Sequence, residues 1–532
     1  MLHAVQNSVT EVTFSSDRRY DNPFRDIELN VTFAGPNDQE WVVPAFWAGE
    51  GVWKVRFAAP QPGTYQYTTV CTDPRNAGLR GRTDRIEVAG YTGSHPLLSH
   101  GRLQVSENRR YLEHADGTPF FWLADTWWMA LCHRLRWPED VQLLTADRVK
   151  KGFSVIQIVG GLYPDMPAFD PRGANEAGYP LNEDYDTINP AYFDMADLRL
   201  AHLVQAGLVP CLVACWGYFL SWMGVDNTKA FWRYLIARYG AYPMVWCLAG
   251  EATMPYYLSE TREADEQAQR QGWTEVAAYV RQIDPYHNPL TIHPTQYGRE
   301  QVDDPSLLDL DMLQTGHSGT DSIPNTVQSV VESLEREPQM PVFVSEFSYE
   351  GILGRSWEDI QRMGFWMSVL SGSAGHTYGA NGLWQVNNRS QPFGPSPHGQ
   401  SWGDTPWDEA AQLPGSSQLG LGKRLLERFR WWEMRPHPEW VTPASSAEHC
   451  FHPYVAGIPG ELRVIYLPGV PTTRDLPLIQ DIEGEVSYTA LYFNPRDGTE
   501  VPLGAVRPDA DGSWQPPPIP VRHDWILALT AS

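Results

Sequence analysis

Hydrophobic and polar residues alternate with a period of two in the first part of the chain. Four stretches show this pattern, namely VTEVTF (9–14), IELNVTF (27–33), VWKVRFAA (52–59) and TYQYTTV (64–70), and segments rich in Gly, Pro and Asn separate them. Such alternation is typical of strands that bury one face, and the separating residues favour turns. Residues 1–95 are therefore predicted to form an antiparallel β-sandwich.

From residue 96 the pattern changes to short apolar runs that alternate with helical stretches. Residues 232–239, for example, repeat apolar side chains at i, i+3, i+4 and i+7. The apolar runs are PFFWLAD (119–125), FSVIQIVG (153–160), LVPCLVACWG (208–217), MVWCLAGE (244–251), PLTIHP (289–294), LDLDMLQTG (308–316), PVFVSE (341–346) and SAGHTYG (373–379). Eight buried parallel strands alternating with helices predict a closed (β/α)8 TIM barrel over residues 96–435.

After residue 435 the helical period disappears. VSYTALYFNPRDGTEV (486–501) predicts two strands around a turn, and DWILALTA (524–531) predicts a closing strand. Residues 436–532 are therefore predicted to form a second antiparallel β-sandwich. The expected fold class is α/β, with a TIM barrel flanked by two β-sandwich domains.

Two glutamates stand at the ends of predicted barrel strands. Glu251 ends the fourth run and Glu346 ends the seventh. Carboxylates at the carboxyl ends of barrel strands point into the mouth where such enzymes keep their chemistry. Glycoside hydrolysis needs one carboxyl group to protonate the leaving oxygen and a second to attack the sugar or activate water. The two glutamates are predicted to be catalytic, and the alternative for either is an ion pair in the barrel rim.

Composition narrows the range of partners. The 532 residues include 40 basic and 64 acidic side chains, a formal net charge of -24, and 42% of them are hydrophobic. Without a basic block, nucleic acid and an anionic membrane are not expected as partners. The 22 Trp and 24 Tyr favour a carbohydrate substrate mildly, because their rings suit the apolar faces of sugars. A homo-oligomer is left open.

Neither a metal site nor a cofactor site is expected. The sequence contains no HExxH motif, and no Walker or dinucleotide glycine motif occurs in the right context. The six scattered cysteines are predicted to be free thiols. The first residues lack a basic segment followed by an apolar stretch, which favours a cytoplasmic protein, or a secreted one if a leader has been removed.

Other polar and aromatic residues near the predicted strand ends are candidates for substrate binding. Asp125 could hold sugar hydroxyls, and the alternative is a helix cap beside core tryptophans. His317 and His293 could bind the ring or a carboxylate, and the alternative for both is a structural histidine. Aromatic residues could stack on the sugar or pack in the core. The full set of predicted substrate-binding residues is Asp125, Trp127, Trp128, Trp216, His317, Tyr349, His376, Tyr378 and Trp384.

Several segments together resemble the apiosidase-like family of barrel glycoside hydrolases. They occur in the order FFWLADTWW, DYDTINPAYF, GLVPCLVACWG, YPMVWCLAGE, LQTGHSG, PVFVSEFSYEG and SAGHTYGANGLW. The N-terminal stretch resembles the sandwich that often precedes these barrels. The C-terminal stretch is similar to a sandwich labelled as a collagen-binding domain, a label that does not indicate function. Family members have an aspartate after two glycines at the end of strand four, whereas this chain has Ala249, Gly250 and Glu251.

The resemblance implies an exo-acting, retaining glycoside hydrolase. In the large clan of retaining barrel glycosidases the acid/base follows strand four and the nucleophile follows strand seven, which implies these roles for Glu251 and Glu346 respectively. Tyr349 could donate a hydrogen bond that keeps Glu346 ionised. The expected substrate is a terminal sugar, such as the furanose apiose, on a plant-type glycan or glycoside. The alternative is a carbohydrate-binding or adhesion protein on an inactive barrel.

Overall fold

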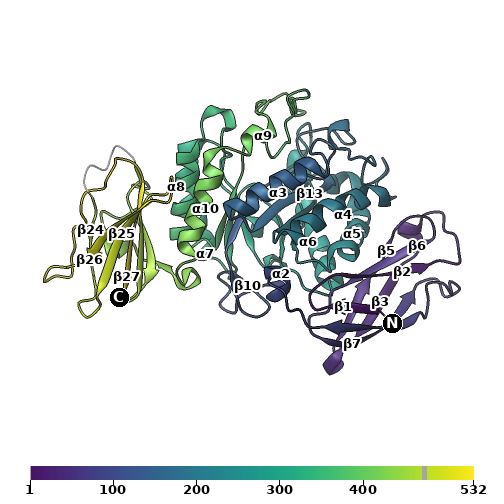
Figure 1. Ribbon diagram of the computed structural model, residues 1–532. Helices are drawn as coiled ribbons and strands as arrows, with labels where there is room; N and C mark the ends of the chain where they lie inside the picture. Colours follow the sequence, from purple (N-terminus) through teal and green to yellow (C-terminus); the bar gives the residue numbers. More distant parts are fainter. Residues whose placement is uncertain (1, 470–475, 532) are drawn as a thin grey trace.

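The computed structural model describes residues 2–469 and 476–531, and three parts follow one another along the molecule. Figure 1 shows antiparallel sheets near the N-terminus (purple) at one end, a barrel with its helices in the middle, and further sheets (yellow-green) at the other end. The predicted fold class is confirmed. The domain boundaries at residues 95 and 435 remain a proposal.

The N-terminal part contains two sheets that enclose a core of their own. A five-stranded sheet has the order β1-β8-β7-β3-β4, and a three-stranded sheet has the order β2-β6-β5. One pair differs from the expected antiparallel pattern, since β1 and β8 run parallel. The elements are β1 (Leu2–Val5), β2 (Thr10–Ser15), α1 (Pro23–Asp26), β3 (Leu29–Ala34), β4 (Glu40–Pro44), β5 (Phe46–Trp47), β6 (Val52–Phe57), β7 (Gly63–Cys71) and β8 (Thr83–Ala89).

The barrel has all eight strands that the apolar runs predict, and every neighbouring pair is parallel. They are β12 (Trp122–Thr126), β13 (Val155–Leu162), β14 (Val209–Cys215), β15 (Val245–Cys247), β16 (Leu290–Thr291), β17 (Asp311–Gln314), β18 (Val342–Glu346) and β19 (Gly375–Tyr378). The order is β16-β15-β14-β13-β12-β19-β18-β17, so β16 and β17 are the two ends. At this seam the amide of Asp309 donates to the carbonyl of Leu290 at 2.8 Å, and the Thr291 hydroxyl donates to the carbonyl of Leu310 at 2.9 Å.

Helices surround the barrel strands, as the alternation of patterns predicts. They are α3 (Glu139–Lys151), α4 (Pro190–Gln205), α5 (Phe219–Tyr239), α6 (Arg262–Ile283), α7 (Ile323–Leu334) and α8 (Glu358–Leu370), followed by α9 (Trp407–Ala410) and α10 (Pro414–Leu426). After α4 the chain turns at Gly207, which has φ +87° and hands over to β14. A residue with a side chain rarely adopts that φ.

Three further sheets complete the described part of the molecule. Before the barrel, α2 (Pro96–Ser99) leads to a three-stranded sheet of β9 (Leu103–Val105), β10 (Leu112–His114) and β11 (Pro119–Phe120). After the barrel, a six-stranded antiparallel sheet has the order β20-β22-β23-β27-β25-β26, beside a pair of β21 and β24. Their bounds are β20 (Arg435–Pro436), β21 (Val441–Thr442), β22 (Tyr454–Ile458), β23 (Leu462–Leu467), β24 (Leu478–Ile479), β25 (Tyr488–Phe493), β26 (Glu500–Ala505) and β27 (Trp525–Ala531).

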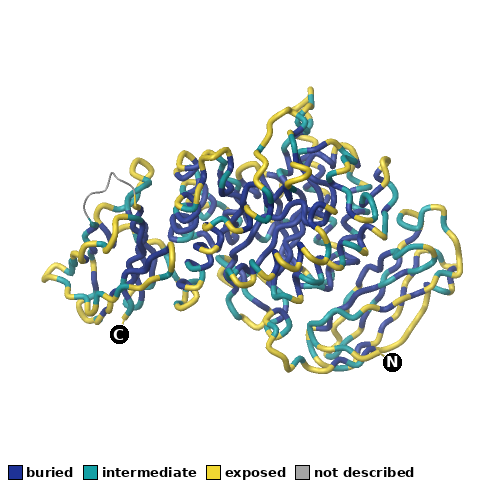
Figure 2. The backbone as a smooth tube through the Cα atoms, turned by 45° about the horizontal axis from the view of Figure 1, so that its top comes forward, coloured by how far each residue is buried: buried dark blue, intermediate teal, exposed yellow. Residues whose placement is uncertain are grey.

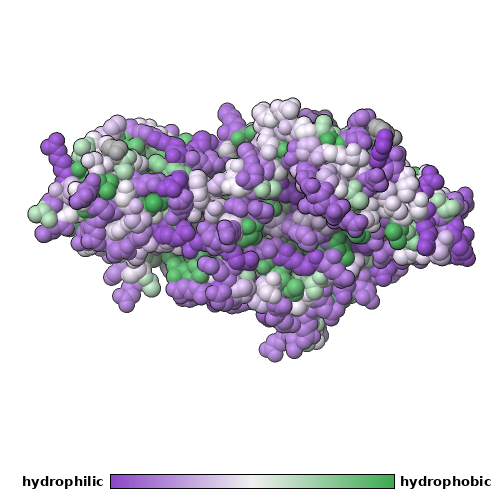
Figure 3. Space-filling model, turned by 90° about the horizontal axis from the view of Figure 1, so that it is seen from below, coloured by the Kyte–Doolittle hydropathy of each residue, from purple (hydrophilic) through white to green (hydrophobic). Residues whose placement is uncertain are grey.

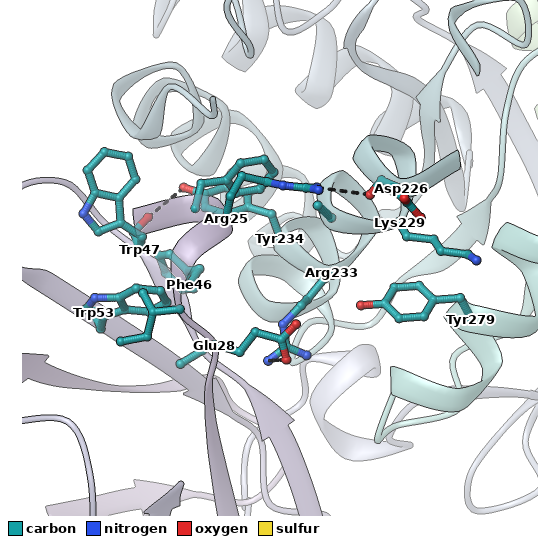
Figure 4. Close-up of a pocket in the computed structure, with 14 residues that line it drawn as sticks. Arg25, Glu28, Phe46, Trp47, Trp53, Asp226, Lys229, Arg233, Tyr234 and Tyr279 are labelled. Atoms are coloured by element: carbon teal, nitrogen blue, oxygen red, sulfur yellow. Dashed lines mark hydrogen bonds and ion pairs between the residues drawn. The ribbon is translucent and has the colours of Figure 1, made fainter. Parts of the chain in front are cut away.

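The N-terminal sheets contact the barrel through α5 and α6, where a cavity of about 260 Å³ lies between them (Figure 4). The Tyr234 hydroxyl donates to the carbonyl of Trp47 at 3.1 Å, and Arg25 donates to the carbonyl of Asp226 at 3.2 Å. Cations and anions both line this cavity, and Arg233 lies 3.5 Å from Glu28. The contact therefore combines charged side chains with apolar ones such as Phe24, Phe46 and Trp53.

Buried residues concentrate inside the barrel and between its strands and helices (Figure 2). The face in Figure 3 is mostly hydrophilic with separate apolar patches. Among the described residues, none of the helices combines the length and hydrophobicity needed to cross a bilayer. Within the same ranges, His, Cys, Asp and Glu do not gather into a group of three or more suited to a metal ion. All six cysteines are free.

Candidate active site

A cavity of about 250 Å³ lies at the carboxyl ends of the barrel strands. Its polar side chains come from segments that follow several different strands, and aromatic rings make up much of the rest. The polar residues are Asp165, Glu251, Gln314, His317, Glu346 and His398, and the aromatic residues are Trp128, Trp216, Tyr257, Tyr349, Trp384 and Trp402. A small cavity with apolar ring faces and a few acids has the chemistry to bind one sugar ring.

Glu346 is the last residue of β18 and is held by two histidines. His317 Nε2 lies 2.9 Å from Oε1, and His293 Nε2 lies 3.4 Å from Oε2. Burial alone would raise the pKa of Glu346, but hydrogen bonding and positive charge from His293 and His317 outweigh burial and lower this pKa to about 2. Glu346 is therefore ionised at neutral pH. It also raises the pKa of His317, against the effect of burial.

Glu251 lies on the segment after β15 and meets different neighbours. Trp216 Nε1 donates to Oε2 at 3.1 Å, and Gln314 Nε2 donates to Oε1 at 3.0 Å. Burial, and then the negative charge of Glu346, raise the pKa of Glu251 to about 7. The two glutamates thus face one cavity with pKa values shifted in opposite directions, which suits an acid and a base.

The backbone around Glu251 is fixed by its neighbours. Glu251 has φ +41°, a conformation that is uncommon outside glycine. The Gly250 amide donates to the carbonyl of Cys215, the last residue of β14, and the Ala252 amide donates to the carbonyl of His293 at 3.0 Å. A Cβ at Gly250 would lie 2.2 Å from the Trp216 ring, so no other residue fits without moving that ring. The sequence AGE therefore lets the indole pack beside the carboxylate that it binds.

Aromatic residues predicted from the sequence form part of the cavity wall. Trp128, Trp216, Tyr349 and Trp384 all line the cavity. Trp128 Nε1 donates to the Tyr349 hydroxyl at 3.0 Å, and the rings of Tyr349 and Trp384 are stacked with centroids 6.0 Å apart. Burial, and then the charge of Glu346, raise the pKa of the Tyr349 hydroxyl well above its usual value.

Asp125 and Trp127 are not in the cavity lining. Asp125 is fully buried, lies 2.5 Å from Arg148 on α3, and accepts a hydrogen bond from Trp127 Nε1 at 2.6 Å. Burial raises the pKa of Asp125, and the charge of Arg148 opposes that shift. The side chain faces the surrounding helices, because successive strand residues point to opposite faces. Its observed contacts join β12 to α3.

Asp125→Ala is expected to destabilise the protein by about 1.5–3 kcal/mol, because it removes the buried carboxylate that Arg148 Nε contacts and leaves Asp147 as the remaining ion-pair partner of Arg148. Urea unfolding followed by circular dichroism measures the effect. Asp408→Asn, which alters an exposed pair with Arg389, is the control and should change stability little. A normal midpoint in the Asp125 variant, combined with weaker sugar binding, would contradict the structural role.

His376 and Tyr378 on β19 also lie outside the cavity lining. His376 is buried against α8, with Nδ1 3.3 Å from the Ser368 hydroxyl, and burial lowers its pKa to about 3. The Tyr378 hydroxyl donates to Glu350 at 2.5 Å. Glu350 also accepts from the amide of Gly415 in the first turn of α10, and burial raises its pKa to about 7. These side chains join the barrel wall to its helices.

Several lining residues escaped the sequence analysis. Asp165 follows β13, and His398 and Trp402 come from the long loop between β19 and α9. Asp165 Oδ1 accepts hydrogen bonds from Ser396 and, at 3.4 Å, from Trp402 Nε1. These loops show no hydrophobic periodicity that would indicate which of their residues reach the cavity. The one sequence signal available is an aspartate, Asp165, shortly after the second predicted strand.

The sequence matches two family models. The model described as "Apiosidase-like, catalytic domain" matches residues 106–433, and a domain of unknown function, DUF5060, matches residues 5–72. Among curated proteins, none matches the chain.

Several solved structures share the fold of this chain. One, named a glycoside hydrolase, is 24% identical, covers 83% of this chain and 99% of its own, and has a TM-score of 0.67. A glycoside hydrolase family 5 protein from Bacteroides vulgatus ATCC 8482 is 23% identical, covers 82% and 94%, and has a TM-score of 0.68. A third structure, from the same bacterium, is 17% identical, covers 100% of both chains, and has a TM-score of 0.71. At these identities the likeness shows the fold.

Proposed function

The chain belongs to the apiosidase-like family of glycoside hydrolases, whose catalytic-domain model matches residues 106–433, and from this premise we propose that it removes a terminal sugar with retention of configuration. The observation that carries the proposal is the opposite shift of two pKa values at one cavity. The pKa is about 7 for Glu251 and about 2 for Glu346. At neutral pH this pair provides a proton donor and an ionised nucleophile.

In the proposed mechanism Glu346 attacks the anomeric carbon. The bond to the leaving oxygen breaks as Glu251 transfers its proton to that oxygen, which gives a glycosyl ester on Glu346. Glu251, now ionised, takes a proton from water while the water oxygen attacks the anomeric carbon. The sugar leaves, and both carboxyl groups return to their starting states.

His317 and His293 hold Glu346 for attack. The contact of His317 Nε2 with Oε1 at 2.9 Å fixes one carboxylate oxygen, while His293 Nε2 lies farther from Oε2, at 3.4 Å. The second oxygen is therefore the better candidate for the attacking atom. Its lone pairs are not already committed to a strong partner.

We propose a small neutral sugar as the residue that is released, and a furanose such as apiose on a plant-type glycan or glycoside is the first candidate. The cavity of about 250 Å³ is below the usual size for a drug-sized ligand, which supports a single ring. The small volume of the cavity also supports exo action, because it has room for one terminal sugar.

A screen of aryl glycosides tests the proposal. We expect hydrolysis of at least one furanoside, release of the sugar with its original anomeric configuration in early NMR spectra, and no turnover by Glu346→Ala. A protein that binds sugars but hydrolyses none of them would favour a carbohydrate-binding role instead. Release of the opposite anomer would show that the enzyme inverts the anomeric configuration, and the proposed retaining mechanism would be wrong.

Activity is expected to fall as the pH rises through about 7, because Glu251 must be protonated to act as the acid. Glu346 is already ionised far below this pH, so no acidic limb is expected in the range where the protein is folded. Around Glu251, the charges of Glu346 and Asp165 raise its pKa, while Gln314 and His293 lower it. The measurement is kcat/KM as a function of pH. If the fall of activity at alkaline pH persists unchanged in Glu251→Gln, a group other than Glu251 causes it.

The remaining predictions concern the protein in the cell. We propose a cytoplasmic location, or a secreted one if a leader has been removed, and we leave homo-oligomerisation open. The predicted boundaries at residues 95 and 435 also stand as proposals. Cell fractionation tests the location, and analytical ultracentrifugation measures the oligomeric state.

A further inference from the structure

The active-site cavity contains a third carboxylate, Asp165, that the proposed mechanism does not use. Asp165 follows β13 and lines the same cavity as Glu251 and Glu346. Its Oδ1 accepts hydrogen bonds from Ser396 and Trp402, both on the loop after β19. Among the described residues both hydrogen bonds to this carboxylate go to Oδ1, and Asp165 keeps partial exposure. One oxygen is therefore committed to the protein, and the other is open to a ligand in the cavity.

The surroundings of Asp165 point to a hydroxyl-bearing ligand. The Tyr257 hydroxyl accepts a hydrogen bond from the Asp165 amide at 3.1 Å, and the ring of His398 meets the Tyr257 ring edge-on at 5.2 Å. Across the cavity, Trp384 is almost fully buried, and its Nε1 has no partner among the described residues. Burial raises the pKa of Asp165, and the hydrogen bonds from Ser396 and Trp402 oppose this shift. In its ionised form the carboxylate accepts hydrogen bonds only, so its partners are O–H or N–H groups.

The charges of the lining exclude an acidic ligand. Three carboxylates and no Lys or Arg line the cavity, and the His317 ring is already engaged by Glu346. A uronate or a sulfated sugar would bring a further negative charge close to these groups in a partly dry site, which is costly. A neutral sugar meets no such repulsion.

We propose that Asp165 is a specificity-determining residue that accepts hydrogen bonds through Oδ2 from hydroxyl groups of the terminal sugar, so that the cavity takes neutral, hydroxyl-rich sugars and rejects uronates. This inference rests on the proposed function for its substrate class. Asp165 also links the loop after β19 to the barrel, so the experiment must separate contact with the sugar from support of the loop.

The experiment compares Asp165→Asn with Ser396→Ala on a glycoside that the protein hydrolyses and on analogues that each lack one hydroxyl. Ser396→Ala removes one of the two hydrogen bonds that link Asp165 to the loop, leaves the bond from Trp402, and keeps the carboxylate. We expect Asp165→Asn to lower kcat/KM on the parent glycoside about 10- to 100-fold, the usual loss for a hydrogen bond to a charged group. On the analogue that lacks the contacted hydroxyl, the same substitution should cost less than about 2-fold, because the partner is already gone. Ser396→Ala should affect all the analogues alike.

A pH profile supplies a second readout that a purely structural role would not move. The charge of Asp165 contributes to the raised pKa of Glu251. Asp165→Asn should therefore shift the alkaline limb to lower pH, and Ser396→Ala, which keeps the carboxylate, should shift the limb less. Equal losses in both variants on every analogue, with no shift of the limb, would overturn the proposal.

Calorimetry of the free sugar distinguishes this inference from the proposed function. Binding needs no turnover, so weaker binding by Asp165→Asn can be measured even in a protein without hydrolytic activity. Absence of all hydrolysis would remove the proposed function and leave the Asp165 contact standing. Hydrolysis with tight binding of a matched uronate would remove the Asp165 inference alone.

Discussion

Replacing Glu346 with Gln is expected to lower kcat by at least ~10⁴-fold on every glycoside that the protein hydrolyses, because no covalent intermediate forms without the nucleophile. The amide keeps the size of the side chain and can still contact His317, whose Nε2 lies 2.9 Å from Oε1. We therefore expect the variant to fold and to bind the sugar. Steady-state rates measure the first effect, and calorimetry measures the second.

The matched control is Glu335→Gln, the same chemical change at an exposed position after α7. It should leave kcat and binding unchanged. A Glu346→Gln variant that keeps within about 10-fold of the normal rate, while still folded, would remove Glu346 from the nucleophile role, since a nucleophile deletion costs far more.

Replacing Glu251 with Ala is expected to lower rates by about 10²- to 10⁴-fold on glycosides with poor leaving groups, because proton transfer to the leaving oxygen is lost. A dinitrophenyl glycoside should form the intermediate at a nearly normal rate, since its leaving group needs little protonation. Added azide should then speed turnover and give a glycosyl azide of retained configuration, because a small anion attacks the intermediate without help from a base. Comparison of dinitrophenyl and alkyl glycosides, with and without azide, measures both effects.

Glu251→Gln is the companion variant. It should show the same dependence on the leaving group, and its rescue by azide should be weaker because the side chain still fills the space beside Trp216 and Gln314. Equal losses on good and poor leaving groups would reverse the assignment. So would an azide product of inverted configuration.

The barrel and the strand-end position of Glu346 could be predicted because a buried strand reads as an apolar run. All eight runs became strands, and Glu346 lies at the end of β18 as predicted. Glu251 was placed at a strand end, but β15 stops at Cys247 and the carboxylate sits on a tightly bonded segment beyond it. Apolar composition marks the strand, and backbone pairing sets its end.

The direction of strand side chains was harder to predict. Asp125 and Tyr378 are paired in register on neighbouring strands, and both face the surrounding helices and not the cavity. In a fully buried strand both faces are apolar, so the sequence pattern does not say which face a polar residue takes. Asp165 and Trp402 lie far apart in the chain and meet only because the loops that carry them fold together. No local sequence pattern indicates that residues so far apart in the chain will be in contact.

The seam between β16 and β17 makes the barrel wall mechanically uneven. Elsewhere neighbouring strands are joined by ladders, whereas β16 and β17 share a backbone bond and the bonds of the Thr291 hydroxyl and the Asp309 carboxylate. The segment after β16 adds a bond from the Gln314 amide to the Gln296 carbonyl and the contact of Arg299 with Asp311. The two strands themselves lack a ladder, so we expect their amide hydrogens to exchange sooner than those of the other barrel strands. The carbonyl and amide of His293, next to the seam, also bond to the segment that carries Glu251. Breathing of the wall at this point therefore reaches both glutamates, because His293 Nε2 also lies 3.4 Å from Glu346 Oε2, and the Thr315 amide after β17 donates to the Glu346 carbonyl at 3.0 Å.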